Sequence, residues 1–348
     1  MIYCNRLRFF LAVLFGTFVV VASMVCRDAH KSVWLDTAFL KRPEAVRKRL
    51  RAEGFKQLFF QSTDKLKLDA LFLQRPNATC NVILCAGWLP GRKEGMASFY
   101  TLLPPTCNIL MFDARGHGRS EGPLLRNLWS YGVDEYNDVI GALDFVRSKN
   151  ALPTVIVGLC AGAFNAAHAL IVLHRQGRLD CYDVRGLVFD SGWASVDAVS
   201  RTALPTAACE FVRSRLCRLT GQKNDRTGAD DSAVVRTALA GVQSLYRLGH
   251  GMVYAPFEQK NERKTNLFDK IGELPLPLLF IHASDDQYVA IEDTRRLCAA
   301  AQRPKEWWIE TPSKHACHHL KYTDAYRMQL CGFMHQVLDK PMLHTCNG

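Results

Sequence analysis

The chain has 348 residues, a formal net charge of +11, 48% hydrophobic residues and 22% charged residues. This composition excludes a disordered or fibrous chain, and the length suffices for one large α/β domain with an insertion. The positive charge is spread along the chain, apart from a denser basic segment between 41 and 51. No zinc-finger spacing or aromatic–basic interleaving accompanies it, so we expect no nucleic-acid partner.

The 13 cysteines are an odd number and form no C-x-x-C pair. Several lie in apolar runs, among them Cys85 and Cys107, where a free thiol packs as a small hydrophobe. This pattern indicates a reducing compartment rather than a disulfide framework. No cysteine–histidine cluster has the spacing of a complete metal site, and we expect neither a metal nor a cofactor.

An apolar run from Phe9 to Val25 follows Arg6 and Arg8. It is long for a signal-peptide core and short for a spanning helix. We interpret segment 1–30 as a single-pass membrane anchor, the alternative being a signal that is cleaved to leave a secreted or periplasmic protein. Segment 31–54 is predicted to form a basic amphipathic helix near lipid headgroups. The basic residues after the run favour a catalytic domain on the cytosolic side.

Short apolar runs alternate with helix-like segments through 55–191 and again through 274–348, which we assign to one core. The first two runs are separated by a turn at Asp64 and predict an antiparallel hairpin at a sheet edge. The later runs predict a parallel sheet with helices on both faces. The strand-like runs cover 55–61, 66–74, 81–86, 107–112, a run from 154, 186–189 and 276–282.

Segment 192–273 breaks this rhythm. It contains helix-like stretches at 207–219 and 233–248, separated by a polar break at 221–228. It is too long for a simple crossover between neighbouring strands. We predict a helical cap inserted after the sixth strand, over the sheet edge where ligands bind in such folds.

The run from Thr154 leads through a sharp turn at Cys160 into a helical pattern. Gly158 and Gly162 stand two positions before and after Cys160, as expected where a strand turns directly into a helix and its neighbours must be small. The apex side chain then projects above the sheet beside N–H groups at the helix start. Those groups and the helix dipole favour developing negative charge, so the position suits a nucleophile.

Five motifs in order carry a family resemblance: Gly87-Trp88, the stretch from Asp113 to Ser120, the turn at Cys160, Asp286 three residues before Val289, and His315. With these motifs the chain resembles the α/β-hydrolases over about residues 55–338. The resemblance implies an α/β-hydrolase fold, with a mostly parallel central sheet and helices on both faces. It also implies a triad in the order nucleophile, acid and histidine.

In that order the resemblance assigns Cys160 as nucleophile, Asp286 as acid and His315 as base. The backbone N–H groups of Ala161 and Trp88 would form the oxyanion hole.

Several residues compete for these roles. Asp285 and Asp190 are alternatives for the acid, and the position three before Val289 favours Asp286. His318 and His319 are alternatives for the base, and the spacing to the last helix in similar proteins favours His315. We predict that the two competing histidines form a solvated start to that helix. Asp113, Arg115 and His117 are expected to brace loops, and His168 to be packed or to cap a helix.

A cysteine at the nucleophile position resembles dienelactone hydrolases and the bile-acid-CoA amino-acid acyltransferases, which share features with acyl-CoA thioesterases. This implies an enzyme that cleaves a small-molecule ester or thioester through an acyl group on Cys160, and a membrane anchor suits a lipid-derived substrate. One alternative is an acyltransferase that uses the same triad. The other is a non-catalytic, membrane-tethered protein that keeps the fold.

Overall fold

The computed structural model describes residues 43–88, 92–122, 132–220, 233–249, 266–302 and 305–339. The predicted segment 1–30 lies outside these residues. Of segment 31–54, the structure describes the helix α3 (Pro43–Ala52), which buries Val46 and Leu50. Among the helices that are described, none is long and apolar enough to cross a membrane.

Eight strands form one sheet in the order β1-β2-β4-β3-β5-β6-β7-β8. The β1–β2 hairpin is antiparallel and lies at the sheet edge, as predicted, and β2 also pairs antiparallel with β4. The remaining pairs are parallel. The strands are β1 (Lys56–Gln61), β2 (Lys67–Leu73), β3 (Cys80–Cys85), β4 (Cys107–Phe112), β5 (Thr154–Leu159), β6 (Val184–Asp190), β7 (Leu278–Ala283) and β8 (Lys305–Thr311).

Every residue of β3, β4, β5 and β7 is buried, which explains why these strands appear in the sequence as continuous apolar runs. The strand β8 was not predicted. It is an edge strand with two charged residues at its start, so it lacks the uninterrupted apolar run by which the other strands were recognised.

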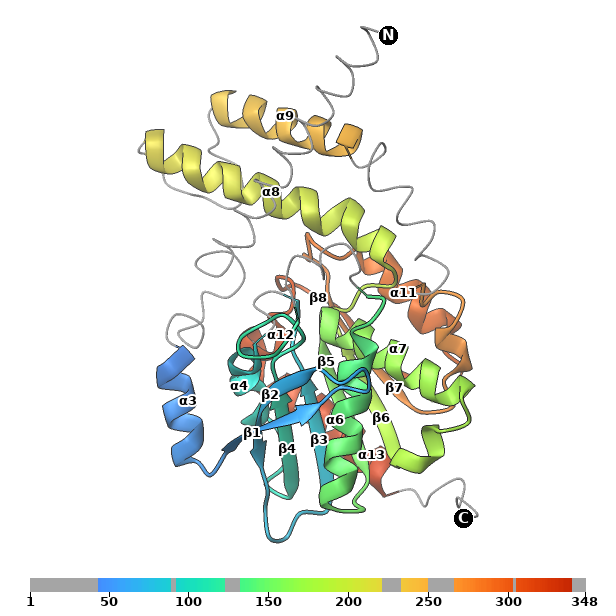
Figure 1. Cartoon of the computed structure of the whole chain (residues 1–348). Coiled ribbons are helices and arrows are strands. Elements are labelled where there is room, and N and C mark those ends of the chain that lie inside the picture. Colours follow the sequence, from blue (N-terminus) through green and yellow to red (C-terminus); the bar gives the residue numbers. More distant parts are fainter. Residues whose placement is uncertain are drawn as a thin grey trace, which may run out of the picture.

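Helices cover both faces of the sheet, as predicted (Figure 1). One core cluster joins α6, α7 and α11 to one face, and a second joins α3, α4 and α13 to the other. The helices of these layers are α4 (Ala97–Tyr100), α6 (Tyr136–Lys149), α7 (Ala161–Arg175), α11 (Ile291–Ala300), α12 (His318–Lys321) and α13 (Thr323–Leu338). Short 3-10 helices are η1 (Lys93–Met96), η2 (Leu179–Tyr182) and η4 (Ile271–Glu273).

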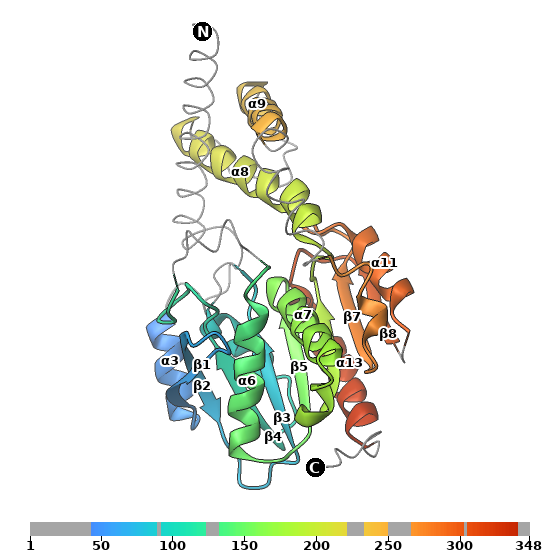
Figure 2. The same ribbon diagram turned by 45° about the vertical axis from the view of Figure 1, so that its right-hand side comes forward.

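Between β6 and β7 the chain forms two further helices, α8 (Val196–Thr220) and α9 (Ala233–Gly249). They run side by side beyond the edge of the sheet at which the parallel strands end (Figure 1, Figure 2). The Tyr246 hydroxyl of α9 donates a hydrogen bond of 2.7 Å to the Ser200 carbonyl of α8. Residues 221–232 and 250–265 lie outside the described part, so the exact limits of the predicted cap, 192–273, stay a prediction.

Candidate active site

The turn between β5 and α7 has the tight geometry that its sequence predicts. Cys160 has φ 55° and ψ −118°, a strained conformation for a residue with a side chain. A Cβ on Gly158 would lie 2.4 Å from the Ala163 Cα, and one on Gly162 would lie 2.1 Å from the Cys85 backbone oxygen. No side chain fits at either position, which confirms the steric reason for both glycines.

The Gly87–Trp88 loop lies directly against the Cys160 side chain. A Cβ on Gly87 would be 3.1 Å from the Cys160 Cβ and 3.7 Å from its Sγ. Cys160 itself is half-buried and touches the core clusters on both faces of the sheet. Ala161 is the first residue of α7, so its N–H has no acceptor within the helix. Gly87, the neighbour of Trp88, therefore lies against the sulfur, and Ala161 follows Cys160 at the start of α7.

His315 and Asp286 are joined by a hydrogen bond of 2.5 Å between the histidine Nδ1 and the carboxylate Oδ2. Their side chains are almost completely buried. Because Nδ1 is engaged with the carboxylate, Nε2 is the nitrogen that remains for exchanging a proton with Cys160. The three residues predicted from the motif order thus come together at one end of the sheet.

Burial and neighbouring charge shift the pKa values of His315 and Asp286 in opposite directions. Burial alone would lower the pKa of His315, but the charges of Asp286 and Cys160, together with hydrogen bonding to both, raise that pKa well above 6.5. Burial alone would raise the pKa of Asp286, but the charge of His315 outweighs it and holds that pKa below 3.8. The structure therefore favours an ionised acid beside a protonated histidine.

The loop after β7 holds the acid in place through its own backbone. Asp286 Oδ1 accepts hydrogen bonds from the N–H groups of Tyr288 (2.8 Å) and Val289 (3.0 Å), which leaves Oδ2 for His315. The Val289 side chain is buried in the core. The three-residue spacing between acid and valine thus has a physical cause, since the same turn anchors the carboxylate and the core. Asp285 is exposed on this loop.

His282 is a site residue that the sequence analysis missed. Its Nε2 lies 3.1 Å from the Val289 carbonyl, and its Nδ1 lies 2.8 Å from the Thr294 hydroxyl. Nε2 also lies 3.4 Å from Asp286 Oδ2. Burial lowers the pKa of His282, so the ring is a neutral brace under the acid loop.

Asp190, the alternative acid, is bonded elsewhere. It accepts hydrogen bonds from the Ser191 hydroxyl (2.8 Å) and the Tyr326 hydroxyl (2.9 Å), and burial raises its pKa to about 6. The Ser191 hydroxyl also accepts a 3.2 Å bond from the N–H of Ala316, the residue after His315. Asp190 therefore supports, through Ser191, the loop that carries His315. The sequence did not reveal this role.

The prediction of a solvated pair at His318 and His319 is wrong. Both side chains are buried, and burial lowers their pKa values to about 4 and about 3. The His319 ring stacks on Phe99 at 3.9 Å between centroids, and its Nε2 lies 3.0 Å from the Ser98 hydroxyl. The His318 ring packs on Trp308 at 5.0 Å. The two imidazoles at the start of α12 are therefore neutral and packed among aromatic rings, whereas a solvent-exposed pair was predicted.

The turn after β4 is a brace, as predicted. Asp113 accepts hydrogen bonds from both the backbone N–H (2.9 Å) and the Nζ (2.8 Å) of Lys93, and from the N–H of Arg119 (3.1 Å). A Cβ on Gly118 would lie 2.0 Å from the Asp113 carboxylate, so only glycine fits there. Lys93 also donates to Asp69 (2.7 Å) and is fully buried. Lys93 therefore holds in place the segment that follows the Gly87–Trp88 loop. The sequence did not indicate this role.

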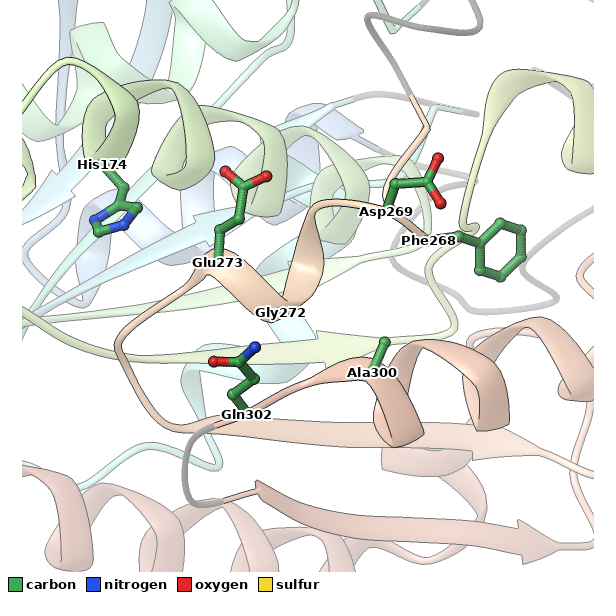
Figure 3. Close-up of a pocket in the computed structure, with 7 residues that line it drawn as sticks. All are labelled: His174, Phe268, Asp269, Gly272, Glu273, Ala300 and Gln302. Carbon is green, nitrogen blue, oxygen red and sulfur yellow. The ribbon is translucent and has the colours of Figure 1, made fainter.

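A surface cavity of about 510 Å³ is lined by residues of α7, η4 and α11 and of the chain beside them (Figure 3). His174, near the end of α7, and Glu273 of η4 are among its lining residues. His174 follows Ala161 by 13 helical positions, or about 20 Å along the axis. The cavity is therefore separate from the candidate active site. Within the described part of the chain, no group of three or more His, Cys, Asp or Glu residues could hold a metal ion.

Comparison with known proteins decides the family. A model of the "Alpha/beta hydrolase family" matches residues 82–327, which include the strand-to-helix elbow at 158–162, Asp286 and His315. The chain belongs to the α/β-hydrolase family. The uncharacterized protein YqkD of Bacillus subtilis is 23% identical over 267 residues, which cover 76% of this chain and 74% of that protein.

Solved structures of esterases share the fold at low sequence identity. The esterase Pf2001 of Pyrococcus furiosus is 16% identical, with a TM-score of 0.58 over 88% of this chain and 96% of that one. The esterase EaEST of Exiguobacterium antarcticum is 15% identical, with a TM-score of 0.51 over 80% of this chain and 100% of that one. The α/β-hydrolase fold and a hydrolase enzyme are thereby confirmed. The triad and the cysteine mechanism remain proposals.

Proposed function

We propose that this α/β-hydrolase cleaves a carboxylic ester or thioester through an acyl group on Cys160. The observation that carries the proposal is the buried 2.5 Å bond between His315 and Asp286 at the strained turn that presents Cys160. A positioned base and an orienting acid are what a thiol needs to act as a nucleophile. The esterases that share the fold add support for the reaction class.

In the first half of the reaction, His315 Nε2 holds the proton given up by Cys160, and the sulfur attacks the substrate carbonyl carbon. A C–S bond forms, and the carbonyl π electrons move onto oxygen, where the N–H groups of Ala161 and Trp88 stabilise the charge. The oxyanion then collapses, breaks the bond to the leaving alcohol or thiol, and leaves an acyl-Cys160. His315 returns its proton to the leaving group.

In the second half, His315 takes a proton from water, and the hydroxide attacks the acyl carbon. Collapse of this second oxyanion breaks the C–S bond and releases a carboxylic acid, while the sulfur recovers its proton. Asp286 keeps the imidazole oriented throughout and stabilises its charged form. An amine or alcohol in place of water would give an acyltransferase with the same residues.

The test is intact-mass spectrometry of the protein after incubation with p-nitrophenyl esters and acyl-CoA thioesters of graded chain length. We expect a mass increase of one acyl group in the wild type and in His315→Gln after prolonged incubation, and none in Cys160→Ala. An adduct that persists in Cys160→Ala would contradict the proposal, as would the absence of any adduct or turnover with every ester and thioester. Free acid as the product identifies a hydrolase, whereas diversion to an added amine identifies a transferase.

A further inference from the structure

Three side chains of the cap helix α8 meet the loop that carries the catalytic acid. Thr202, Thr206 and Glu210 stand four residues apart and so share one stripe of the helix. The Thr202 hydroxyl donates to the Tyr288 carbonyl at 2.6 Å, and the Thr206 hydroxyl donates to the Gln287 carbonyl at 3.2 Å. The Tyr288 hydroxyl in turn donates to the Glu210 carboxylate. Helix α8 is therefore fastened to this loop at three points.

Tyr288 also touches both members of the acid–base pair. Its backbone N–H donates to Asp286 Oδ1 at 2.8 Å, and its ring lies 5.6 Å from the His315 ring, centroid to centroid. The residue is only 7% exposed, so it has little room to move independently of its neighbours. One residue thus connects the cap helix to Asp286, through its backbone, and to His315, through its ring.

Pro205 lies inside α8, among the three tethers. Proline has no N–H and cannot make the bond to the carbonyl four residues earlier, which weakens a helix at that point. Thr202 holds the helix on one side of this weak point, and Glu210 holds it on the other. The part of α8 beyond Pro205 is therefore the part whose position depends on the Thr206–Gln287 and Tyr288–Glu210 bonds.

We infer that Tyr288 is a positioning residue that couples the placement of the cap helix α8 to the alignment of His315 and Asp286. With α8 seated, the Glu210 bond holds the Tyr288 ring against His315 and its backbone against Asp286. With α8 displaced, that support is lost and the base is less well oriented towards Cys160. The inference deepens the proposed function and rests on it, because it assigns a regulator to the same acid and base.

The experiment compares Tyr288→Phe, Glu210→Ala and the double variant with the wild type, using a short p-nitrophenyl ester. We expect each single variant to lower kcat about fivefold with KM nearly unchanged, the size of effect of one lost hydrogen bond. The double variant should be no slower than the slower single variant, because both changes break the same bond. Tyr182→Phe is the matched control, since it removes a hydrogen bond from another buried tyrosine to a carboxylate, Asp144 at 2.8 Å, away from the site.

A second readout does not depend on turnover. In protein labelled with ¹⁵N-histidine, the proton on His315 Nδ1 reports the bond to Asp286 by NMR. We expect this signal to shift or broaden in Tyr288→Phe and Glu210→Ala, and to stay unchanged in Tyr182→Phe. If the wild type forms no acyl-enzyme, the proposed function fails and the NMR signal alone decides the coupling.

Three results would overturn the coupling. A rise in KM at constant kcat would make Tyr288 a substrate contact. Additive effects of the two substitutions would separate Glu210 from Tyr288. An unchanged His315 signal in both single variants would show that α8 does not reach the acid–base pair.

Discussion

At the scale of single residues, His315 stands out because neighbouring charges and hydrogen bonds together affect its pKa more than burial does. The charges of Asp286 and Cys160 raise its pKa well above 6.5, although burial acts in the opposite direction. Part of that rise comes from Cys160, through its charge and its hydrogen bond to the ring. The pKa of this histidine is therefore a direct measure of how closely the sulfur is coupled to the base.

We predict that Cys160→Ser lowers the pKa of His315, because a hydroxyl cannot supply the charge by which Cys160 raises that pKa. The measurement is an NMR titration of labelled histidine in the wild type and the variant. Cys181→Ser, which changes an exposed thiol on η2, is the control and should leave the titration unchanged. An identical His315 pKa in Cys160→Ser would mean that the sulfur and the imidazole do not interact.

The two buried aspartates should affect stability with opposite sign. Burial raises the pKa of Asp190 from 3.8 to about 6, so between these values the folded state binds more protons than the unfolded state. The free energy of unfolding then falls as pH rises through this window. Asp286, whose pKa lies below 3.8 because the charge of His315 outweighs its burial, contributes stability above 3.8 that is lost as pH falls through its folded pKa.

Asp190→Asn should therefore flatten the decline in stability between pH 3.8 and about 6, and Asp286→Asn should not. The measurement is urea unfolding of the wild type and both variants across that window. Activity separates the two residues again: we expect Asp286→Asn to lower kcat by at least about a hundredfold. If Asp190→Asn caused the larger loss of kcat, the assignment of the acid would be wrong.

At the scale of elements, the close approach of α7 to the ends of β3 and β5 decides which residues the elbow accepts. A Cβ on Gly162 would lie 2.1 Å from the Cys85 carbonyl oxygen, and a backbone atom cannot move aside as a flexible side chain can. The exposed Gly332 of α13 has nothing within 4 Å of such a Cβ. A glycine-to-alanine substitution is therefore sterically blocked at Gly162 of α7 and unobstructed at Gly332 of α13.

We predict that Gly162→Ala lowers the free energy of unfolding by about 1–3 kcal/mol or more, since it forces the elbow apart. Gly332→Ala should raise it by about 1 kcal/mol through better helix propensity alone. Chemical denaturation of the two variants beside the wild type gives both values. Equal effects of the two substitutions would contradict the tight packing of the elbow.

Some elements could be predicted from the sequence and others could not. The hairpin β1–β2, the central strands and α7 followed from local patterns, since each has continuous apolar runs or fixed small residues. The strand β8 and the burial of His318 and His319 did not follow, because they depend on partners distant in sequence. A polar residue in a sequence looks solvated until the aromatic neighbours that cover it are known.

At the scale of the whole molecule, the predicted anchor in segment 1–30 lies outside the described residues and stays a prediction. We expect the full-length protein to remain in the membrane pellet after alkaline carbonate extraction, because a long apolar run partitions into the bilayer. Leu14→Arg combined with Val19→Arg should release it, since charge within the run opposes insertion. Release of the unmodified protein would instead indicate a cleaved signal or a soluble form.

A glycosylation sequon can report on which side of the membrane the catalytic domain lies. Asn77 is exposed between β2 and β3 and begins an Asn-Ala-Thr glycosylation sequon. In a eukaryotic host we expect no mobility shift on glycosidase treatment, in keeping with a cytosolic catalytic domain. A shift that disappears in Asn77→Gln would place the domain in the secretory lumen.

The sequence by itself determined the alternation of strands and helices, the glycines of the elbow and the identity of the nucleophile candidate. These depend on periodicity and on steric limits within a few residues of chain. The sequence favoured Asp286 as the acid and His315 as the base, but only the tertiary structure shows their hydrogen bond, since the two are 29 residues apart. It also brought Ser191 to Ala316 across 125 residues and Tyr288 to Glu210 across 78. Contacts at such separations arise from how the sheet and the cap pack together, and no local pattern encodes them.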